Sequence, residues 1–134
     1  MKSTFSCFEN DGRVYLQNKA INTADIPWNR HPAFEGVELK HLITSSQTGG
    51  SFSYHMVKVA PGKKIGKHIH ETQLETHEII EGNGVCLIEG LEFVYEPGMI
   101  AVLPAAIPHE VIAYADGLLS AGASYVNLHI TRVM

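Results

Sequence analysis

The chain has 134 residues and a formal net charge of −4, with 10 Lys and Arg residues against 14 Asp and Glu residues. It has no basic run, which argues against nucleic acid as a partner because phosphate binding needs clustered positive charge. No apolar run approaches the roughly 20 residues of a membrane span, and the first ten residues lack the apolar core of a signal peptide, so we expect no membrane partner and a cytoplasmic location.

The segment before residue 37 shows little regular periodicity. Residues 14–16 form a candidate early strand. Pro27 and Pro32 indicate extended chain or turns, because proline disfavours helix at the residue before it. We therefore expect an N-terminal extension over residues 1–36, with irregular or edge-strand structure, followed by a β-rich domain over residues 37–134.

From residue 37 onward, short segments rich in β-branched and aromatic residues alternate with turn signals. Glycine or proline punctuates the chain at positions 49–50, 61–62, 82–84, 97–98, 104 and 116–117. The expected strands are Val37–Ile43, Ser51–Ala60, Lys67–His70, Glu75–Ile80, Val85–Ile88, Leu91–Tyr95, Met99–Leu103, His109–Tyr114 and Ala123–Arg132. Many short, evenly spaced strands predict an all-β sandwich or barrel.

His68 and His70, one residue apart, are the first candidates for metal chemistry. On a strand, residues two apart share a face and lie about 6.5–7 Å apart along the backbone, a spacing that suits two ligands of one ion. A nearby carboxylate and a distant histidine would complete a ligand set of the kind that divalent metals accept.

Two groups of spaced residues resemble the conserved motifs of the cupin superfamily, G-x5-H-x-H-x3,4-E-x6-G and G-x5-P-x-G-x2-H-x3-N. The matching positions are Gly62, His68, His70, Glu75 and Gly82 in the first motif, and Gly98, Pro104 and His109 in the second. Ala106 replaces the second glycine of the second motif, and Ala113 replaces its asparagine. Neither alanine stands at a ligand position, so the resemblance, which covers about residues 51–114, keeps every metal-binding position.

The resemblance implies both a fold and a metal site. Cupins are six- to eight-stranded antiparallel barrels, so we expect an all-β, cupin-type jelly-roll β-barrel in a single domain. Carried over by motif position, the metal ligands are His68, His70, Glu75 and His109. Three imidazoles and one carboxylate suit one divalent transition metal ion, and ligand type does not choose among Fe, Mn, Ni, Cu and Zn. Analogy with small cupins also implies a homodimer.

Glu71 and Glu78 lie close to Glu75 but are expected at the surface. Glu71 directly follows His70, so its side chain would point to the opposite face of a continuing strand. Glu78 has the opposite parity to Glu75 on the following strand. Glu75 alone fits the spacing of the family.

His77 follows Glu75 by two residues, so both side chains should share one face of a strand. Three roles are open for it. The favoured role is a structural one, in which His77 orients a ligand through a hydrogen bond. The second is that of the catalytic acid or base beside the metal. The third is that of a metal ligand that replaces or supplements Glu75.

The remaining histidines have no partner at ligand spacing and are expected in surface or core positions. They are His31, His41, His55 and His129. His129 lies in the last strand-like run and is a weaker candidate for the barrel mouth. Tyr54 and Tyr114 flank the motifs and are candidates either for the pocket lining or for packing.

Four protein ligands leave two adjacent positions open on an octahedral ion, which predicts a metal-dependent enzyme on a small carbonyl- or enol-type substrate. A dioxygenase is slightly favoured. The alternatives are a non-redox lyase, isomerase or cyclase in which the ion acts as a Lewis acid, and a non-catalytic sensor of a small molecule or metal. The order of residues 28–42 is also similar to the lead-in of ChrR-like cupins, a group that holds both sensor domains and small dioxygenases, so it does not separate these classes.

Overall fold

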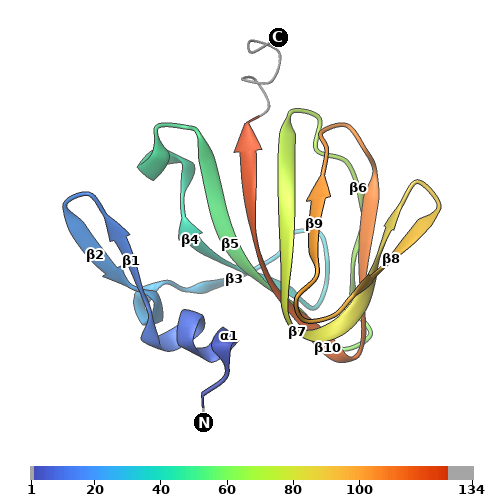
Figure 1. Ribbon diagram of the computed structural model, residues 1–134, viewed down its shortest axis with the longest axis horizontal. Coiled ribbons are helices and arrows are strands. Elements are labelled where there is room, and N and C mark those ends of the chain that lie inside the picture. The colour runs from blue at the N-terminus through green and yellow to red at the C-terminus, as the bar shows by residue number, and fades with distance from the viewer. Residues whose placement is uncertain (1, 127–134) are drawn as a thin grey trace.

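The computed structural model describes residues 2–126, and almost all of them lie in strands or the turns between strands (Figure 1). The one α-helical turn is α1 (Thr4–Ser6), which leads into a π-helical turn over Cys7–Asp11. The strands are β1 (Arg13–Leu16), β2 (Lys19–Asn22), β3 (Trp28–Arg30), β4 (Val37–Ile43), β5 (Phe52–Val59), β6 (Lys64–His68), β7 (Gln73–Ile88), β8 (Leu91–Tyr95), β9 (Ile100–Leu103) and β10 (His109–Val126). Within the described residues no helix has the length and apolarity to cross a membrane.

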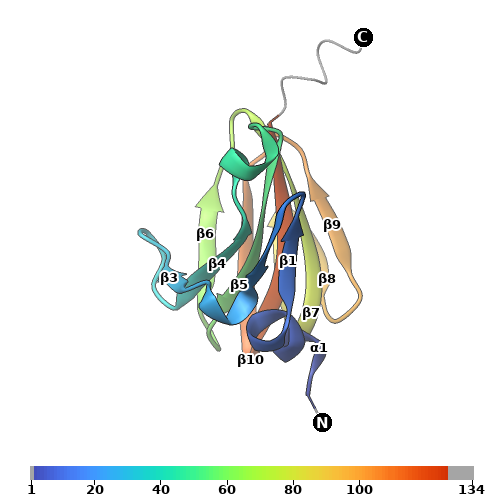
Figure 2. The ribbon, with the colours of Figure 1, turned by 90° about the vertical axis from the view of Figure 1, so that its left-hand side faces the viewer.

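The strands form a jelly-roll arrangement, which confirms the expected all-β fold. β1 and β2 make a separate hairpin, and the main sheet runs in the order β3-β4-β5-β10-β7-β8. β6 pairs with the first half of β10, and β9 pairs with the first half of β7, so these two long strands belong to both halves of the roll. β3 and β8 end the path in the described part of the chain, and the sheet is therefore curved but not closed (Figure 2).

β4 and β8 have the expected boundaries, whereas β7 and β10 are longer than expected. We expected turns at Gly82 and Gly117, but each long strand continues through its glycine. Gly82 has φ +81, and a Cβ at this position would collide with the carbonyl oxygen of Gly117. Glycine therefore lets the two strands bend while they stay in close contact. The predicted last strand, 123–132, extends beyond the described residues, and His129 lies outside them.

The two faces of β4 and β5 have different environments. Lys40, Leu42 and Met56 face the N-terminal segment, where Leu42 and Met56 pack with Phe5 in a small hydrophobic cluster. The alternating residues on the other face line a cavity, and they are Leu39, His41, Ser53, His55 and Val57. The period of two in each strand thus places histidines inside the roll.

Glu9 fixes the N-terminal segment against the outer face of this pair of strands. Its carboxylate accepts hydrogen bonds from Trp28 Nε1 at 2.9 Å and from Lys58 Nζ at 2.7 Å. Its carbonyl oxygen accepts from Lys40 Nζ at 2.6 Å, and Lys40 is only 2 % exposed. Burial lowers the pKa of Lys40, although the Glu9 carboxylate opposes this shift. The buried lysine is therefore explained by packing on the outer face, away from the cavity.

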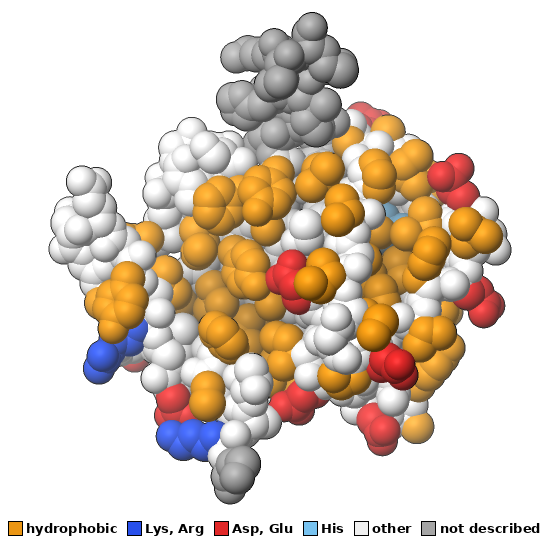
Figure 3. All heavy atoms as spheres, viewed as in Figure 1, with side chains coloured by type: hydrophobic (Ala, Val, Ile, Leu, Met, Phe, Trp, Pro, Cys, Tyr) orange, Lys and Arg blue, Asp and Glu red, His pale blue; other side chains and the backbone are white. Residues whose placement is uncertain are grey.

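Exposed hydrophobic side chains lie on β8 and β9. Figure 3 shows hydrophobic side chains spread over the strands that face the viewer in Figure 1. The exposed members on these two strands are Leu91, Phe93, Val94, Ile100 and Val102. Exposed apolar surface of this kind often marks subunit contacts. The homodimer implied by the resemblance stays a prediction.

Candidate metal centre

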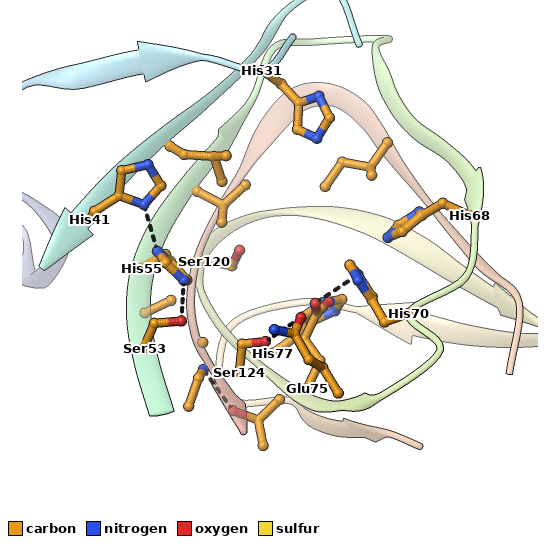
Figure 4. Close-up of a pocket in the computed structure, with 18 residues that line it drawn as sticks. His31, His41, Ser53, His55, His68, His70, Glu75, His77, Ser120 and Ser124 are labelled. Atoms are coloured by element: carbon orange, nitrogen blue, oxygen red, sulfur yellow. Dashed lines mark hydrogen bonds and ion pairs between the residues drawn. The ribbon is translucent and has the colours of Figure 1, made fainter. Parts of the chain in front are cut away.

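A cavity of about 350 Å³ lies inside the roll (Figure 4). Side chains from β4, β5, β6, β7 and β10 line it. Small residues of β10 (Ser120, Ala121, Gly122, Ala123 and Ser124) form one side, and a Cβ at Gly122 would collide with the carbonyl oxygen of Thr76. The cavity is at the lower end of the range for small-molecule sites, about 300–1,000 Å³.

The four residues predicted as metal ligands come together, and three of them, His68, His70 and Glu75, line this cavity. His68 ends β6, His70 follows in the next turn, Glu75 lies in β7 and His109 begins β10. One potential ligand atom from each residue lies within 4.8 Å of those of the other three. The strand expected over residues 67–70 ends at His68, so His70 reaches the cluster from a turn, where its carbonyl oxygen accepts a 2.7 Å hydrogen bond from the backbone N–H of Ala106.

Ala106, which replaces a motif glycine, holds the left-handed conformation that glycine would favour, with φ +66. This conformation costs a residue with a Cβ roughly 1–2 kcal/mol. The turn is therefore retained without its glycine, and it still supports the backbone of His70.

Backbone carbonyls fix the tautomers of two of the histidines. His68 Nδ1 donates to the carbonyl oxygen of Gly66 at 2.8 Å, and His109 Nδ1 donates to that of Ile107 at 3.3 Å. A neutral imidazole that donates through Nδ1 keeps a lone pair on Nε2. Both side chains are thus prepared to act as ligands through Nε2.

His109 Nε2 is buried and has no hydrogen-bond partner among the described residues. The closest opposite charge is Glu75 Oε1 at 3.7 Å, which is too long for a hydrogen bond. An unsatisfied buried polar atom costs about 1–3 kcal/mol. This nitrogen therefore needs a partner that the described protein atoms do not supply.

Glu75 is the acidic centre of the cluster. Its Oε2 lies 3.0 Å from His70 Nε2, and its Oε1 lies 2.6 Å from His77 Nε2. Burial by itself raises the pKa of Glu75, but the facing imidazoles of His109, His70 and His77 outweigh burial and hold that pKa well below its usual range. The hydrogen bond that His70 Nε2 donates to the Glu75 carboxylate raises the pKa of His70. The carboxylate is thus ionised and available to a cation.

His77 shares the face of Glu75, as expected, and both of its ring nitrogens are engaged. Nδ1 lies 2.8 Å from the hydroxyl of Tyr95, which is 2 % exposed. Burial raises the pKa of Tyr95, so this hydroxyl stays protonated and donates to Nδ1. His77 then donates through Nε2 to Glu75. The sequence did not predict the contact of Tyr95 with His77, because nothing in the spacing of β8 indicates which residue of β7 the tyrosine contacts.

The other acidic and aromatic candidates lie away from the cavity. Glu71 is exposed, as expected. Glu78 is not a free surface carboxylate, because it accepts a 2.8 Å hydrogen bond from the hydroxyl of Tyr54. Tyr54 and Tyr114 do not line the cavity, and Tyr114 is 50 % exposed.

His41 and His55, expected in surface or core positions, are half-buried in the cavity wall and paired with each other. They stand directly opposite each other in the pairing of β4 with β5, and their Nδ1 atoms lie 2.7 Å apart. Ser53 Oγ lies 2.9 Å from His55 Nε2. His31 also lines the cavity, and its Nδ1 accepts a 3.0 Å hydrogen bond from the backbone N–H of Ala33. Histidines at matching parity on two strands were a signal, but the register that joins them is not visible in the sequence.

Comparison with known proteins gives a family and a fold. A family model described as a cupin domain matches residues 55–121, half of the chain. No curated protein sequence matches the chain.

Solved structures of similar shape include a predicted oxalate decarboxylase from Thermotoga maritima, at 20% identity and TM-score 0.72, with 79% of this chain and 97% of that chain covered. The polyketide cyclase RemF from Streptomyces resistomycificus has 18% identity and TM-score 0.68 over 81% of this chain and 79% of that one. The DMSP lyase DddQ from Ruegeria pomeroyi DSS-3 has 19% identity and TM-score 0.65 over 79% and 59%. At these identities the likeness concerns the fold.

Proposed function

The chain belongs to the cupin superfamily, and from this premise we propose that it is a metal-dependent enzyme that acts on a small organic substrate through a carbonyl or enol oxygen. The observation that carries the proposal is the buried Nε2 of His109, which has no hydrogen-bond partner in the described part of the chain and lies beside three further candidate ligands, His68, His70 and Glu75. Three neutral imidazoles and one carboxylate suit a divalent transition ion.

The donor set fits such an ion in charge as well as in composition. The carboxylate of Glu75 is ionised, and His68 and His109 keep their Nε2 lone pairs because Nδ1 of each donates to a backbone carbonyl. An ion held by these residues would serve as a Lewis acid that polarises a substrate oxygen. The hydrogen bond from His77 holds Glu75 in place, and the hydroxyl of Tyr95 holds His77. We therefore assign His77 a positioning role, with direct proton transfer as the alternative.

We place a non-redox reaction of the lyase, isomerase or cyclase type first. Such reactions move protons, and the cavity carries imidazoles beyond the four donors, on β4, β5 and β7. Structures of similar fold are named as a decarboxylase, a cyclase and a lyase, which supports this order. The dioxygenase favoured by the sequence is the second candidate, because the same donor set accepts iron, copper or nickel.

Metal content and turnover test this proposal together. Wild-type protein purified without added metal, His109→Ala and the surface variant Glu71→Gln would be compared by elemental analysis. We expect about one ion per chain in the wild type and in Glu71→Gln, and loss of the ion in His109→Ala. Equal metal content in all three would contradict the ligand assignment.

The reaction class is tested on the metal-loaded protein with a panel of 2-oxo acids and 1,3-diketones, with and without oxygen. Product formation that does not require oxygen is expected. Turnover that consumes oxygen in proportion to product would favour the dioxygenase. Absence of turnover with tight ligand binding would favour the non-catalytic sensor.

A further inference from the structure

A second chain of polar groups lies across the cavity from His68, His70 and Glu75 (Figure 4). Ser53 Oγ lies 2.9 Å from His55 Nε2, and His55 Nδ1 lies 2.7 Å from His41 Nδ1. The two rings meet edge to face at 85°. All three residues line the cavity, and all three are half-buried.

The hydrogen-bond chemistry leaves one end of this chain open. Only one hydrogen can lie between the two Nδ1 atoms, so one imidazole donates and the other accepts. Whichever imidazole donates, His55 Nε2 is paired with Ser53. His41 Nε2 has no hydrogen-bond partner among the described residues. The chain therefore ends in a polar atom available to a molecule in the cavity.

The composition of the cavity indicates which molecule this atom would contact. Among the described residues that line the cavity, Glu75 is the only carboxylate, and none is Lys or Arg. If the histidine pair takes up one proton, His55 Nε2 donates to Ser53 and His41 Nε2 donates into the cavity, while the two Nδ1 atoms still share one hydrogen. The pair then carries one positive charge, which suits one carboxylate.

The surroundings of His55 favour its neutral form. Burial lowers the pKa of His55, the charge of His41 lowers it further, and the Glu75 carboxylate opposes both effects. The other titratable groups that line the cavity from neighbouring elements are His31, after β3, His68, at the end of β6, His70, in the segment that follows, and His77, on β7. An anion that binds at His41 would therefore bring a proton with it.

We infer that His41 and His55 bind a carboxylate at the far end of a small acid whose other, metal-chelating end lies at the four donors. The inference rests on the proposed function, because it needs a metal on the opposite wall. A cavity of about 350 Å³ suits a small molecule that reaches both walls. The expected substrate class is thus a small oxo- or hydroxy-dicarboxylic acid.

Two variants of His41 test the roles of its two ring nitrogens independently. In His41→Asn the side-chain amide lies near the position of Nδ1, so the contact with His55 is kept while Nε2 is removed. In His41→Gln the amide reaches toward the position of Nε2. The matched control is His31→Asn, which removes another imidazole from the cavity but keeps an acceptor for the N–H of Ala33.

The experiment first titrates Zn(II) into each protein by calorimetry. The Zn(II)-loaded proteins are then titrated with two matched pairs of acids: 2-oxoglutarate against 2-oxopentanoate, and oxaloacetate against 2-oxobutanoate. Each pair has the same number of carbons and the same 2-oxo acid end, and differs in the far carboxylate. Titrations in buffers with different ionisation enthalpies report proton uptake.

We expect the wild type and His31→Asn to bind at least one dicarboxylate about tenfold more tightly than its partner acid, with uptake of about one proton. His41→Asn should lose this preference and the proton uptake while Zn(II) affinity is unchanged, and His41→Gln should restore part of the preference. Equal affinity of the wild type for both members of both pairs would overturn the inference alone, as would an unchanged preference in His41→Asn. Absence of Zn(II) binding by the wild type would overturn the proposed function, and this inference with it.

Discussion

The two walls of the cavity differ in how their histidines are brought together. His68 and His70 meet Glu75 within eight residues of chain, and His109 joins them through a second short motif. His41 and His55 are 14 residues apart and meet only because β4 and β5 pair in one particular register. On the first wall, His109 Nε2 is buried and has no partner among the described residues, whereas on the second wall His41 and His55 are hydrogen-bonded to each other. A buried nitrogen without a partner points to an ion, whereas a hydrogen-bond chain with one free end, His41 Nε2, points to recognition of a ligand.

The largest effect that would test this contrast is the loss of one donor from the first wall. His109→Ala is expected to weaken the affinity for Zn(II) by more than about 100-fold, since even the partners of ligands change affinity by about 10–100-fold. His55→Asn, on the second wall, should leave this affinity within about twofold. Calorimetric titration of both variants measures the difference. Similar losses in the two variants would mean that the walls do not have separate roles.

Removing the hydrogen bond that supports Glu75 should have the next largest effect on metal affinity. His77→Phe removes the hydrogen bond to Glu75 and leaves Tyr95 without its acceptor, so we expect about a 10–100-fold loss of metal affinity. Tyr95→Phe, which removes only the hydroxyl, should have a smaller effect in the same direction. Turnover lost at full metal occupancy in His77→Phe would instead indicate that His77 transfers a proton.

The second wall should respond to pH in the absence of metal. Because burial and His41 hold the pKa of His55 below its unfolded value, the unfolded chain binds more protons between the two values. The free energy of unfolding should therefore fall as the pH drops below about 6.5, the ordinary histidine value. Urea unfolding at pH 7.5 and pH 5.5 measures this fall, which should be smaller in His55→Asn. A fall of the same size in that variant would place the titration elsewhere.

The smallest expected effect concerns the turn behind His70. Ala106→Gly should raise the free energy of unfolding by about 0.5–1 kcal/mol, because the relief of the left-handed conformation exceeds the entropy that glycine adds to the unfolded chain. Thermal unfolding of the metal-free protein measures it. A lower melting temperature would show that the turn is not strained in the wild type.

Features that depend on residues close together in the sequence could be predicted, whereas features that depend on contacts between distant strands could not. Most of the strands after residue 37 and the clustering of His68, His70, Glu75 and His109 could be predicted, because turn residues and motif spacing are local in sequence. The continuity of β7 through Gly82 could not be predicted, because it depends on contact with Gly117 on a distant strand. The contacts of His77 with Tyr95 and of His41 with His55 were missed for the same reason, since each joins two strands whose register emerges only in the fold.

The central claim is that a metal ion binds at the first wall and not at the second. The most direct test is a crystal structure of the protein loaded with Zn(II), with data collected on both sides of the zinc absorption edge. One anomalous peak is expected among His68, His70, Glu75 and His109, at about 2.0–2.2 Å from the nitrogen and oxygen ligands. A peak between His41 and His55 instead, or no peak at the four donors in protein shown to contain zinc, would contradict the account.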